Sequence, residues 1–162
     1  MAQWLAQESY TLKVAGSSPA LTTNLKLYGM TCNIYYEDWQ IQCCGEPFKI
    51  GERVRWTGES SDQDIMDFHI NFNEDHHAHQ SLNIEGTVTR IVAVTSEEEP
   101  HKRCYSFHEA NLLFEDIQEA DGFESEKEDT DKIHFIFWGY IVTLDDVKVS
   151  AINKQLRPTI KG

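Results

Sequence analysis

The alternation of apolar and polar residues along the chain predicts a series of short β-strands. Over 31–43, Trp39, Ile41 and Cys43 alternate with two glutamines, and this period of two is typical of a half-buried strand. In a strand, such an alternation turns all three apolar side chains toward the interior. We therefore expect the first strand of the fold in this segment.

A second strand is predicted at the end of the segment 45–56, GEPFKIGERVRW. Its glycine, proline and acidic residues place one turn near its start and another at its middle. Val54 and Trp56 then alternate with Arg53 and Arg55. We expect the apolar pair to face the core and the two arginines to face outward.

Two longer apolar runs predict further strands. The segment 132–144 is apolar on both faces, and Gly139 lies where a sharp bend would suit a barrel. In the segment 82–94, Arg90 interrupts an apolar face, which indicates either a β-bulge or a position at the barrel rim. The residues expected to share that face are Ile84, Val88, Val92 and Val94.

One helix is predicted, over 107–119. Ser106 and Glu109 have the spacing of a capping box, in which each side chain satisfies a free backbone N–H at the helix start. The apolar stripe that follows has a helical period and consists of Phe107, Ala110, Phe114 and Ile117.

Two polar segments, 58–81 and 118–131, are expected to be flexible insertions, because neither has a clear hydrophobic period. The remaining pattern predicts a mainly β protein: a small SH3-like or OB-like barrel with one helix and long polar insertions. This barrel is expected to occupy 30–155 as a single domain, and a polar tail follows at 156–162.

The first 29 residues are expected to be a spurious or disordered extension rather than part of the domain. The stretch 14–23, VAGSSPALTT, can be encoded by nucleotides in which gccgg and ccggc flank ttcgagt, and this resembles the T arm of a transfer-RNA gene. MAQWLAQ, at 1–7, can likewise be written as D-arm sequence. We therefore expect translation to start at Met30, with a genuine polar tail as the alternative.

The chain is strongly acidic, with a net charge of −13 at pH 7. Such a surface repels nucleic-acid backbones and anionic membranes, so we expect neither as a partner, whereas a basic protein is compatible with it. No run approaches the roughly 20 apolar residues that a membrane-spanning helix requires. The first 29 residues also lack a secretion signal, so we expect a cytoplasmic location with reduced thiols.

One cluster, NEDHHAHQ at 73–80, contains residue types that bind metals. Imidazole and thiolate groups are the preferred ligands of zinc, and the candidate ligands are His76, His77, His79, Cys43 and Cys44. The paired Cys-x-x-Cys or His-x-x-x-His spacings of structural zinc sites do not occur in the sequence. Solvated histidines and two small, buried cysteines are the competing interpretation, in which the protein has no cofactor.

No catalytic residue is predicted, because the sequence has neither a phosphate-binding glycine loop nor a serine nucleophile elbow. We interpret the protein as a non-catalytic binding or interaction module. The candidate binding-surface residues are Trp39, Gln40, Arg53 and Arg55. The alternative is a zinc-binding protein or a metal-dependent hydrolase built on the histidine cluster and the two adjacent cysteines.

The run YYEDWQIQCCGEPFKIGERVRW resembles the start of a family of small bacterial proteins of unknown function. Three motifs carry the resemblance: Trp-Gln, then Cys-Cys-Gly-x-Pro-Phe, then Gly-acid-x-Val-x-Trp. The matching residues are Trp39, Gln40, Cys43, Cys44, Gly45, Pro47, Phe48, Gly51, Glu52, Val54 and Trp56. The resemblance implies a start close to Met30 and implies no activity.

Overall fold

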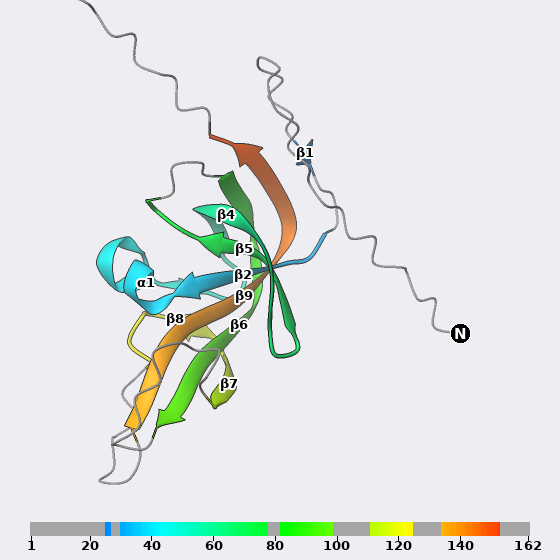
Figure 1. Ribbon diagram of the computed structural model, residues 1–162. Helices are drawn as coiled ribbons and strands as arrows, with labels where there is room; N and C mark the ends of the chain where they lie inside the picture. The colour runs from blue at the N-terminus through cyan, green and yellow to red at the C-terminus, as the bar shows by residue number, and fades with distance from the viewer. Residues whose placement is uncertain (1–24, 27–29, 78–81, 99–110, 125–133, 153–162) are drawn as a thin grey trace, which may run out of the picture.

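The computed structural model describes residues 25–26, 30–77, 82–98, 111–124 and 134–152 (Figure 1). Within these ranges the chain is mainly β, with one short helix. In chain order the elements are β1 (Leu25–Lys26), β2 (Cys32–Glu37), α1 (Asp38–Cys44), β3 (Phe48–Lys49), β4 (Arg53–Ile65), β5 (Phe68–Glu74), β6 (Leu82–Glu98), β7 (Leu112–Ile117), β8 (Glu119–Ala120) and β9 (His134–Ala151).

Five strands form a ring in which each pairs with two neighbours. The order is β9–β2–β5–β4–β6, and β6 returns to β9. All of these pairings are antiparallel except β2–β5, which is parallel and short. β7 continues the sheet beyond β6, β1 pairs with the far end of β9, and β3 pairs with β8. The prediction of a mainly β fold with a small barrel is confirmed.

The longest contact is the ladder between β6 and β9, which is interrupted by three register shifts. One shift falls between Val88 and Arg90, so the predicted bulge at Arg90 is confirmed. Because an extra residue reverses the alternation, Val92 and Val94 turn away from the barrel interior, and the prediction that they share a face with Ile84 and Val88 is wrong.

Two apolar clusters lie on opposite faces of the barrel wall. The cluster inside the barrel is built from β2, β6 and β9 and includes Ile34, Ile84 and Val142. The second cluster includes Val92, Val94 and Ile141. Phe68, next to the β4–β5 turn, and Phe114 of β7 pack against this second cluster. Both faces of β6 and β9 are therefore buried over part of their length, which explains why apolar residues occupy both faces of β9.

Gly139 is the bend that the sequence predicts in β9. Its φ is 141°, a conformation that L side chains rarely adopt. It pairs with Glu37 at the end of β2, and a Cβ here would collide with the carbonyl oxygen of Tyr36. The close approach of two backbones therefore requires glycine at this position.

The strand predicted over 31–43 is wrong in its second half, where β2 stops at Glu37 and α1 begins. The turn places Gln40 and Ile41 inward and leaves Trp39 and both neighbouring cysteines exposed. An alternation over five residues cannot separate a strand from two helical turns, so the local pattern misleads. The N–H of Gly45 donates to the carbonyls of Gln40 and Ile41 and ends the helix.

The insertion predicted at 58–81 is also wrong over its described part. β4 continues to Ile65, turns at residues 66–67, and returns as β5 to Glu74; residues 78–81 lie outside the described ranges. Ile65 and Ile70 are buried in the second cluster. These widely spaced apolar residues provide the buried face of a hairpin whose other face is polar.

The helix predicted over 107–119 is wrong where it can be examined. Residues 112–117 form β7, and its pairing with β6 supplies the backbone hydrogen bonds that a helix would otherwise make internally. The capping box at 106–109 lies outside the described residues. The insertion predicted at 118–131 begins with β8, whose Ala120 is fully buried, and with Gly122, whose N–H donates to the Tyr140 hydroxyl.

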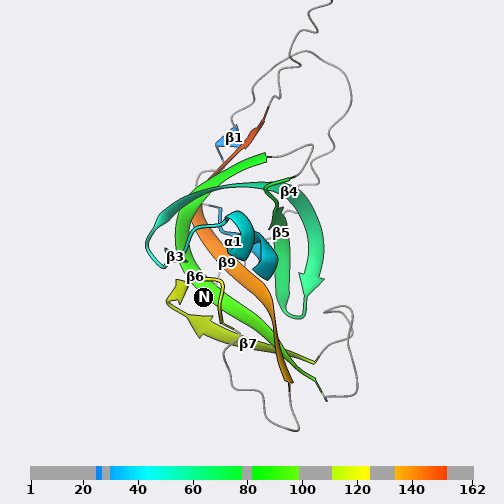
Figure 2. The same cartoon turned by 90° about the vertical axis from the view of Figure 1, so that its left-hand side faces the viewer.

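α1 and the 119–124 segment lie together at one end of the barrel. Gly122 contacts Ile41, and its carbonyl accepts from Gln42 at 2.7 Å. Figure 2 shows α1 in the middle of the view, with the barrel strands around it. The two-residue strand β1 pairs with Val149 and Lys148, and the other residues before Met30 lie outside the described ranges, so the start at Met30 stays a prediction.

We expect Gly139→Ala to destabilise the fold by roughly 3 kcal/mol or more, since it adds a backbone collision to an unfavourable φ. Gly51→Ala is the matched control, because Gly51 also has a positive φ, of 90°, but an added Cβ there meets nothing within 4 Å. That control should cost about 1 kcal/mol. Equal losses in urea unfolding would contradict the close-packing argument.

Candidate functional site

The barrel has an unpaired strand edge because β4 is longer than β5. β4 has 13 residues and β5 has 7, and β5 pairs only with the part of β4 that starts at Gly58. Residues 53–57 of β4 are paired on their other side with β6. The edge of this stretch that faces away from β6 therefore has no strand partner.

The hydrogen-bond alternation shows which peptide groups point to this edge. The carbonyl of Glu52 accepts from the N–H of Val88, so the even-numbered residues of this stretch face β6. Thr57 faces the other way, since its carbonyl accepts from the N–H of Asp75 at 2.9 Å. The peptide groups of Arg53 and Arg55 point in the same direction as Thr57, and no backbone hydrogen bond joins them to any described residue outside β4.

An open pocket of about 360 Å³ lies along this edge. It is lined by residues 52–56 of the turn and β4 and by residues 44–48, which run from the end of α1 to the start of β3. His76 closes the pocket at the end of β5. The volume lies at the lower end of the range of known ligand sites and suits a small molecule or a few side chains.

Three aromatic rings form the apolar floor of the pocket. Tyr36 and Trp56 meet edge to face with ring centroids 5.1 Å apart, and Phe48 and Trp56 do so at 4.9 Å. Gly45 packs so closely on Tyr36 that a Cβ would lie 2.6 Å from the tyrosine hydroxyl. These contacts make the floor a rigid part of the barrel core rather than a loose surface patch.

Glu74 lies directly behind His76 and is the most unusual group at the site. Its side chain has no exposed surface, and neither carboxyl oxygen makes a well-aligned hydrogen bond within the described ranges. Oε1 lies 2.8 Å from Nδ1 of His76, which is the distance of an ion pair. On the other side of the imidazole ring, Nε2 lies 3.4 Å from the hydroxyl of Tyr36.

Burial shifts the proton equilibrium of this pair. Loss of solvation raises the pKa of Glu74 to about 8, and the negative charges of Asp75 and Glu37 act in the same direction. Burial also lowers the pKa of His76, assisted by the charge of His77 and opposed by that of Asp75. At neutral pH, Glu74 is therefore mainly a neutral acid beside a neutral imidazole.

The two adjacent cysteines lie at the end of α1, and Cys44 lines the pocket. Both are exposed, with sulfur atoms 3.0 Å apart, so the interpretation of both as small buried residues is wrong. The hydrogen bond with Cys43 raises the pKa of the Cys44 thiol. By contrast, Cys32 is buried inside the barrel, and burial raises its pKa to about 11.

The four candidate binding-surface residues lie in different surroundings. Trp39 is exposed on α1 with its ring stacked parallel to that of His77, whereas Gln40 is buried and contacts Asp75. Arg53 and Arg55 line the pocket. The Arg53 side chain is engaged with Glu85 at 2.8 Å and with Asp146 at 3.2 Å.

The candidate metal ligands are only partly brought together. His76 and Cys44 line one pocket, His77 lies outside it on the surface beside Trp39, and His79 falls outside the described ranges. Among the residues that are described, no three His, Cys, Asp or Glu side chains are arranged to hold a metal ion. The zinc-dependent alternative therefore gains no support from this arrangement.

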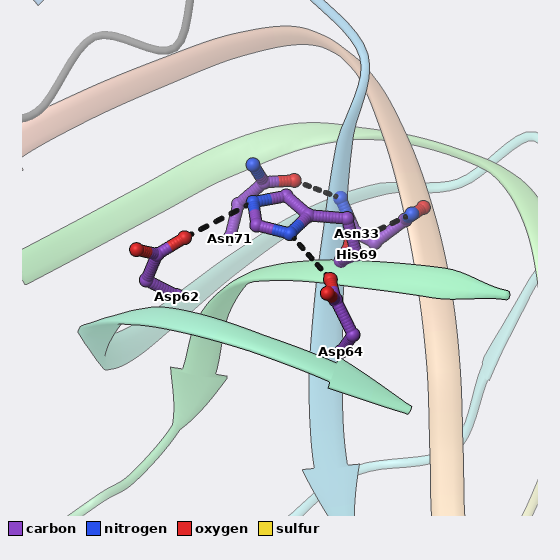
Figure 3. A network of polar contacts seen from close by, with 5 residues as sticks. All are labelled: Asn33, Asp62, Asp64, His69 and Asn71. Atoms are coloured by element: carbon purple, nitrogen blue, oxygen red, sulfur yellow. Dashed lines mark hydrogen bonds and ion pairs between the residues drawn. The ribbon is translucent and has the colours of Figure 1, made fainter. Parts of the chain in front are cut away.

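A second polar cluster lies on the β4–β5 hairpin (Figure 3). His69 places its ring between Asp64, 2.8 Å from Nδ1, and Asp62, 3.6 Å from Nε2. Asn33 of β2 links to this hairpin through the side chain of Asn71 and the carbonyl of His69. The side chains of His69, Asp62 and Asp64 are all substantially exposed, so the cluster is a surface connection between β2, β4 and β5.

Sequence reasoning missed Glu74 and Tyr36 as site residues. Glu74 stands in a polar run that looks solvated, and only the pairing with β2 and β4 shows that its side chain is covered. A weak signal was available, since Glu74 follows Phe72 at a spacing of two and Phe72 packs against the cluster inside the barrel.

We expect the stability of the protein to fall as pH rises from about 4.5 to about 8. Within this window the folded Glu74 retains a proton that the unfolded chain has lost, because the pKa is raised from 4.5 to about 8. The linked loss is at most about 5 kcal/mol and is complete above pH 8. Glu74→Gln should melt near the native protein at pH 5 and clearly above it at pH 9; a pH-independent difference in melting temperature would contradict this.

We expect iodoacetamide to modify Cys43 and Cys44 in the native protein while Cys32 stays protected, since Cys32 is buried and its pKa is raised to about 11. Peptide mass spectrometry after a short reaction at pH 8 reads each site separately. A parallel reaction in denaturant should label Cys32 as well. Equal labelling of Cys32 without denaturant would show that β2 is not held inside the barrel.

None of the helices in the described residues is long and apolar enough to cross a bilayer.

Comparison with known proteins shows the family of this chain. The model of a family of unknown function (DUF6578) matches residues 30–146, which is more than half of the chain, and the chain belongs to this family. The match agrees with the expectation of an uncharacterised family. No curated protein and no solved structure matches the chain.

Proposed function

We propose that the protein is a non-catalytic binding module. The family match brings no activity with it, so the proposal rests on the pocket and the strand edge beside it. The protein captures an extended segment of a partner protein against the unpaired edge of β4. The observation that carries the proposal is the outward-facing peptide groups of Arg53 and Arg55, which have no partner among the described residues outside β4.

Residues 53–56 of β4 leave an unpaired edge within the ring of strands. A closed barrel removes strand edges, and an edge left open is a template for pairing with another chain. Strand addition supplies affinity through main-chain hydrogen bonds and specificity through pockets for alternate side chains. The pocket beside β4 provides both, because it combines the free peptide groups of residues 53 and 55 with an aromatic floor.

The charge of the protein favours a basic partner. The net charge is −13, and two carboxylates, Glu46 and Glu52, line the pocket. The positive charge of Arg53 is already compensated by Glu85 and Asp146. Arg55 also lines the pocket and adds a positive charge, so it is the net charge of the whole protein that favours a positively charged segment.

A peptide titration tests the proposal. The probe is a peptide of about seven alternating valines and threonines with one central lysine, added to the ¹⁵N-labelled full chain. We expect amide shifts at residues 53–56 and 44–48. Arg55→Pro should weaken binding about five- to tenfold, because it removes the free N–H at the edge without breaking the β4–β6 ladder.

Arg55→Ala is the matched control, since it shortens the side chain but retains the N–H, and it should bind within about twofold of the native chain. Thermal melting of Arg55→Pro checks that the barrel remains folded. Shifts that map to β7, or affinity that Arg55→Ala lowers as much as Arg55→Pro does, would overturn strand addition at this edge.

A further inference from the structure

A buried acid that the strand-addition proposal does not use lies behind the pocket, in contact with the lining residue His76. The side chain of Glu74 is fully covered, neither oxygen makes a well-aligned hydrogen bond with a described residue, and its one close polar contact is Nδ1 of His76. A buried carboxyl with a single polar contact among the described residues costs free energy, so its presence needs an explanation. His76 stands between this carboxyl and the pocket.

The groups around His76 match the chemistry of an alkylammonium ion. The rings of Tyr36, Phe48 and Trp56 offer apolar contact for an alkyl chain and the negative potential of ring faces for a cation. Nε2 of His76 is held by nothing stronger than the 3.4 Å contact with Tyr36. A donor that enters the pocket can therefore replace that contact with a shorter hydrogen bond.

We propose that this pocket binds the side-chain ammonium group of a lysine in the docked segment, with Nε2 of His76 as the acceptor and Glu74 as the buried counter-ion. This inference rests on the proposed function and deepens it by naming the residue that is recognised. The lysine stem lies on the aromatic floor, and its charge lies at the end of the pocket that β5 closes.

Binding is coupled to the loss of one proton. Before binding, the Glu74 carboxyl holds a proton and can donate it to Nδ1 of His76, which leaves the imidazole N–H at Nε2. When the ammonium donates to Nε2, the Nε2 proton leaves to solvent and the carboxyl proton transfers to Nδ1. The result is a carboxylate facing an N–H, and one proton is released for each ammonium bound.

Several other ionisable groups surround this pair. They come from β2, from α1 and from the segment after β5, while the facing residues of β4, Gly58 and Trp56, carry no charge. The groups are Tyr36, Glu37, Cys44, Asp75 and His77. The carboxylates of Glu37 and Asp75 favour a cation in the pocket, so they act in the same direction as Glu74.

The test compares the lysine peptide with the same peptide carrying norleucine, which retains the alkyl stem and lacks the ammonium group. We expect the lysine peptide to bind about tenfold more tightly, as for a hydrogen bond to a charged group. Calorimetry in two buffers of different ionisation enthalpy should show one proton released with lysine and none with norleucine. Affinity for lysine should rise between about pH 6 and pH 8.

Two variants assign the effect. Glu74→Gln should lower the affinity for the lysine peptide to that for the norleucine peptide, and it should abolish proton release. Glu59→Gln removes an exposed carboxylate of β4 that does not line the pocket, and it should retain both the lysine preference and the proton release. Equal loss in the two variants would show that diffuse negative charge, and not Glu74, selects the cation.

The outcomes separate this inference from the proposed function. Equal binding of both peptides at the β4 edge without proton release would overturn ammonium recognition and leave strand addition standing. If neither peptide binds, n-butylammonium chloride is the second probe. Proton release on its binding, lost in Glu74→Gln, would uphold the ammonium site and reject strand addition; no binding would reject both.

Discussion

The antiparallel ladder between β6 and β9 is the contact on which the rest of the fold depends. It runs from Leu82 opposite Ala151 to Glu98 opposite His134. β2 and β1 pair with β9, and β4 and β7 pair with β6. Of the strands in the main sheet, β5 alone pairs with neither β6 nor β9. Its register shifts bend both strands and allow one continuous ladder to serve two apolar clusters.

The pocket follows from the same architecture. β4 pairs with β6 over residues 53–58, whereas β5 pairs with β4 only from Gly58 onward. The peptide groups of β4 before Gly58 that face away from β6 therefore have no neighbouring strand. The chain covers this gap only partly, with the extended residues that leave α1. A short helix in place of a longer β2 is thus what keeps the edge accessible, since a continued strand would approach the same space.

In the proposed binding mode, the buried acid and the exposed edge contribute different properties. Main-chain peptide groups can pair with any extended chain, so they contribute affinity but do not select a particular side chain. A covered carboxyl behind an imidazole discriminates by charge, because a cation offsets the cost of ionising it and a neutral side chain does not. The free energy that Glu74 costs the empty barrel is consistent with a role in selection rather than in stability.

The sequence predicts those parts of the fold in which local pattern and burial agree. The bend at Gly139, the outward arginines of β4 and the bulge at Arg90 all have local signals. It fails where distant pairing decides the structure. The stripe that includes Phe114 has a helical period, yet the free edge of β6 makes it a strand.

The site was harder to predict for the same reason. Arg53, Arg55, His76 and Cys44 were each recognised as chemically notable residues, but nothing in the sequence places them around one pocket. Glu74 was overlooked because an acidic residue in a polar run gives no sign that strands from elsewhere will cover it.

The position of β2 within the ring has a consequence for synthesis of the protein. β2 is made early but pairs with residues 139–144 near the other end of the chain. During translation, about a hundred residues are added after β2 before the paired part of β9 is made. Such a separation in sequence slows folding. The nascent chain therefore cannot cover Ile34 and Tyr36 with β9 for most of its synthesis, and apolar surface that stays uncovered favours aggregation.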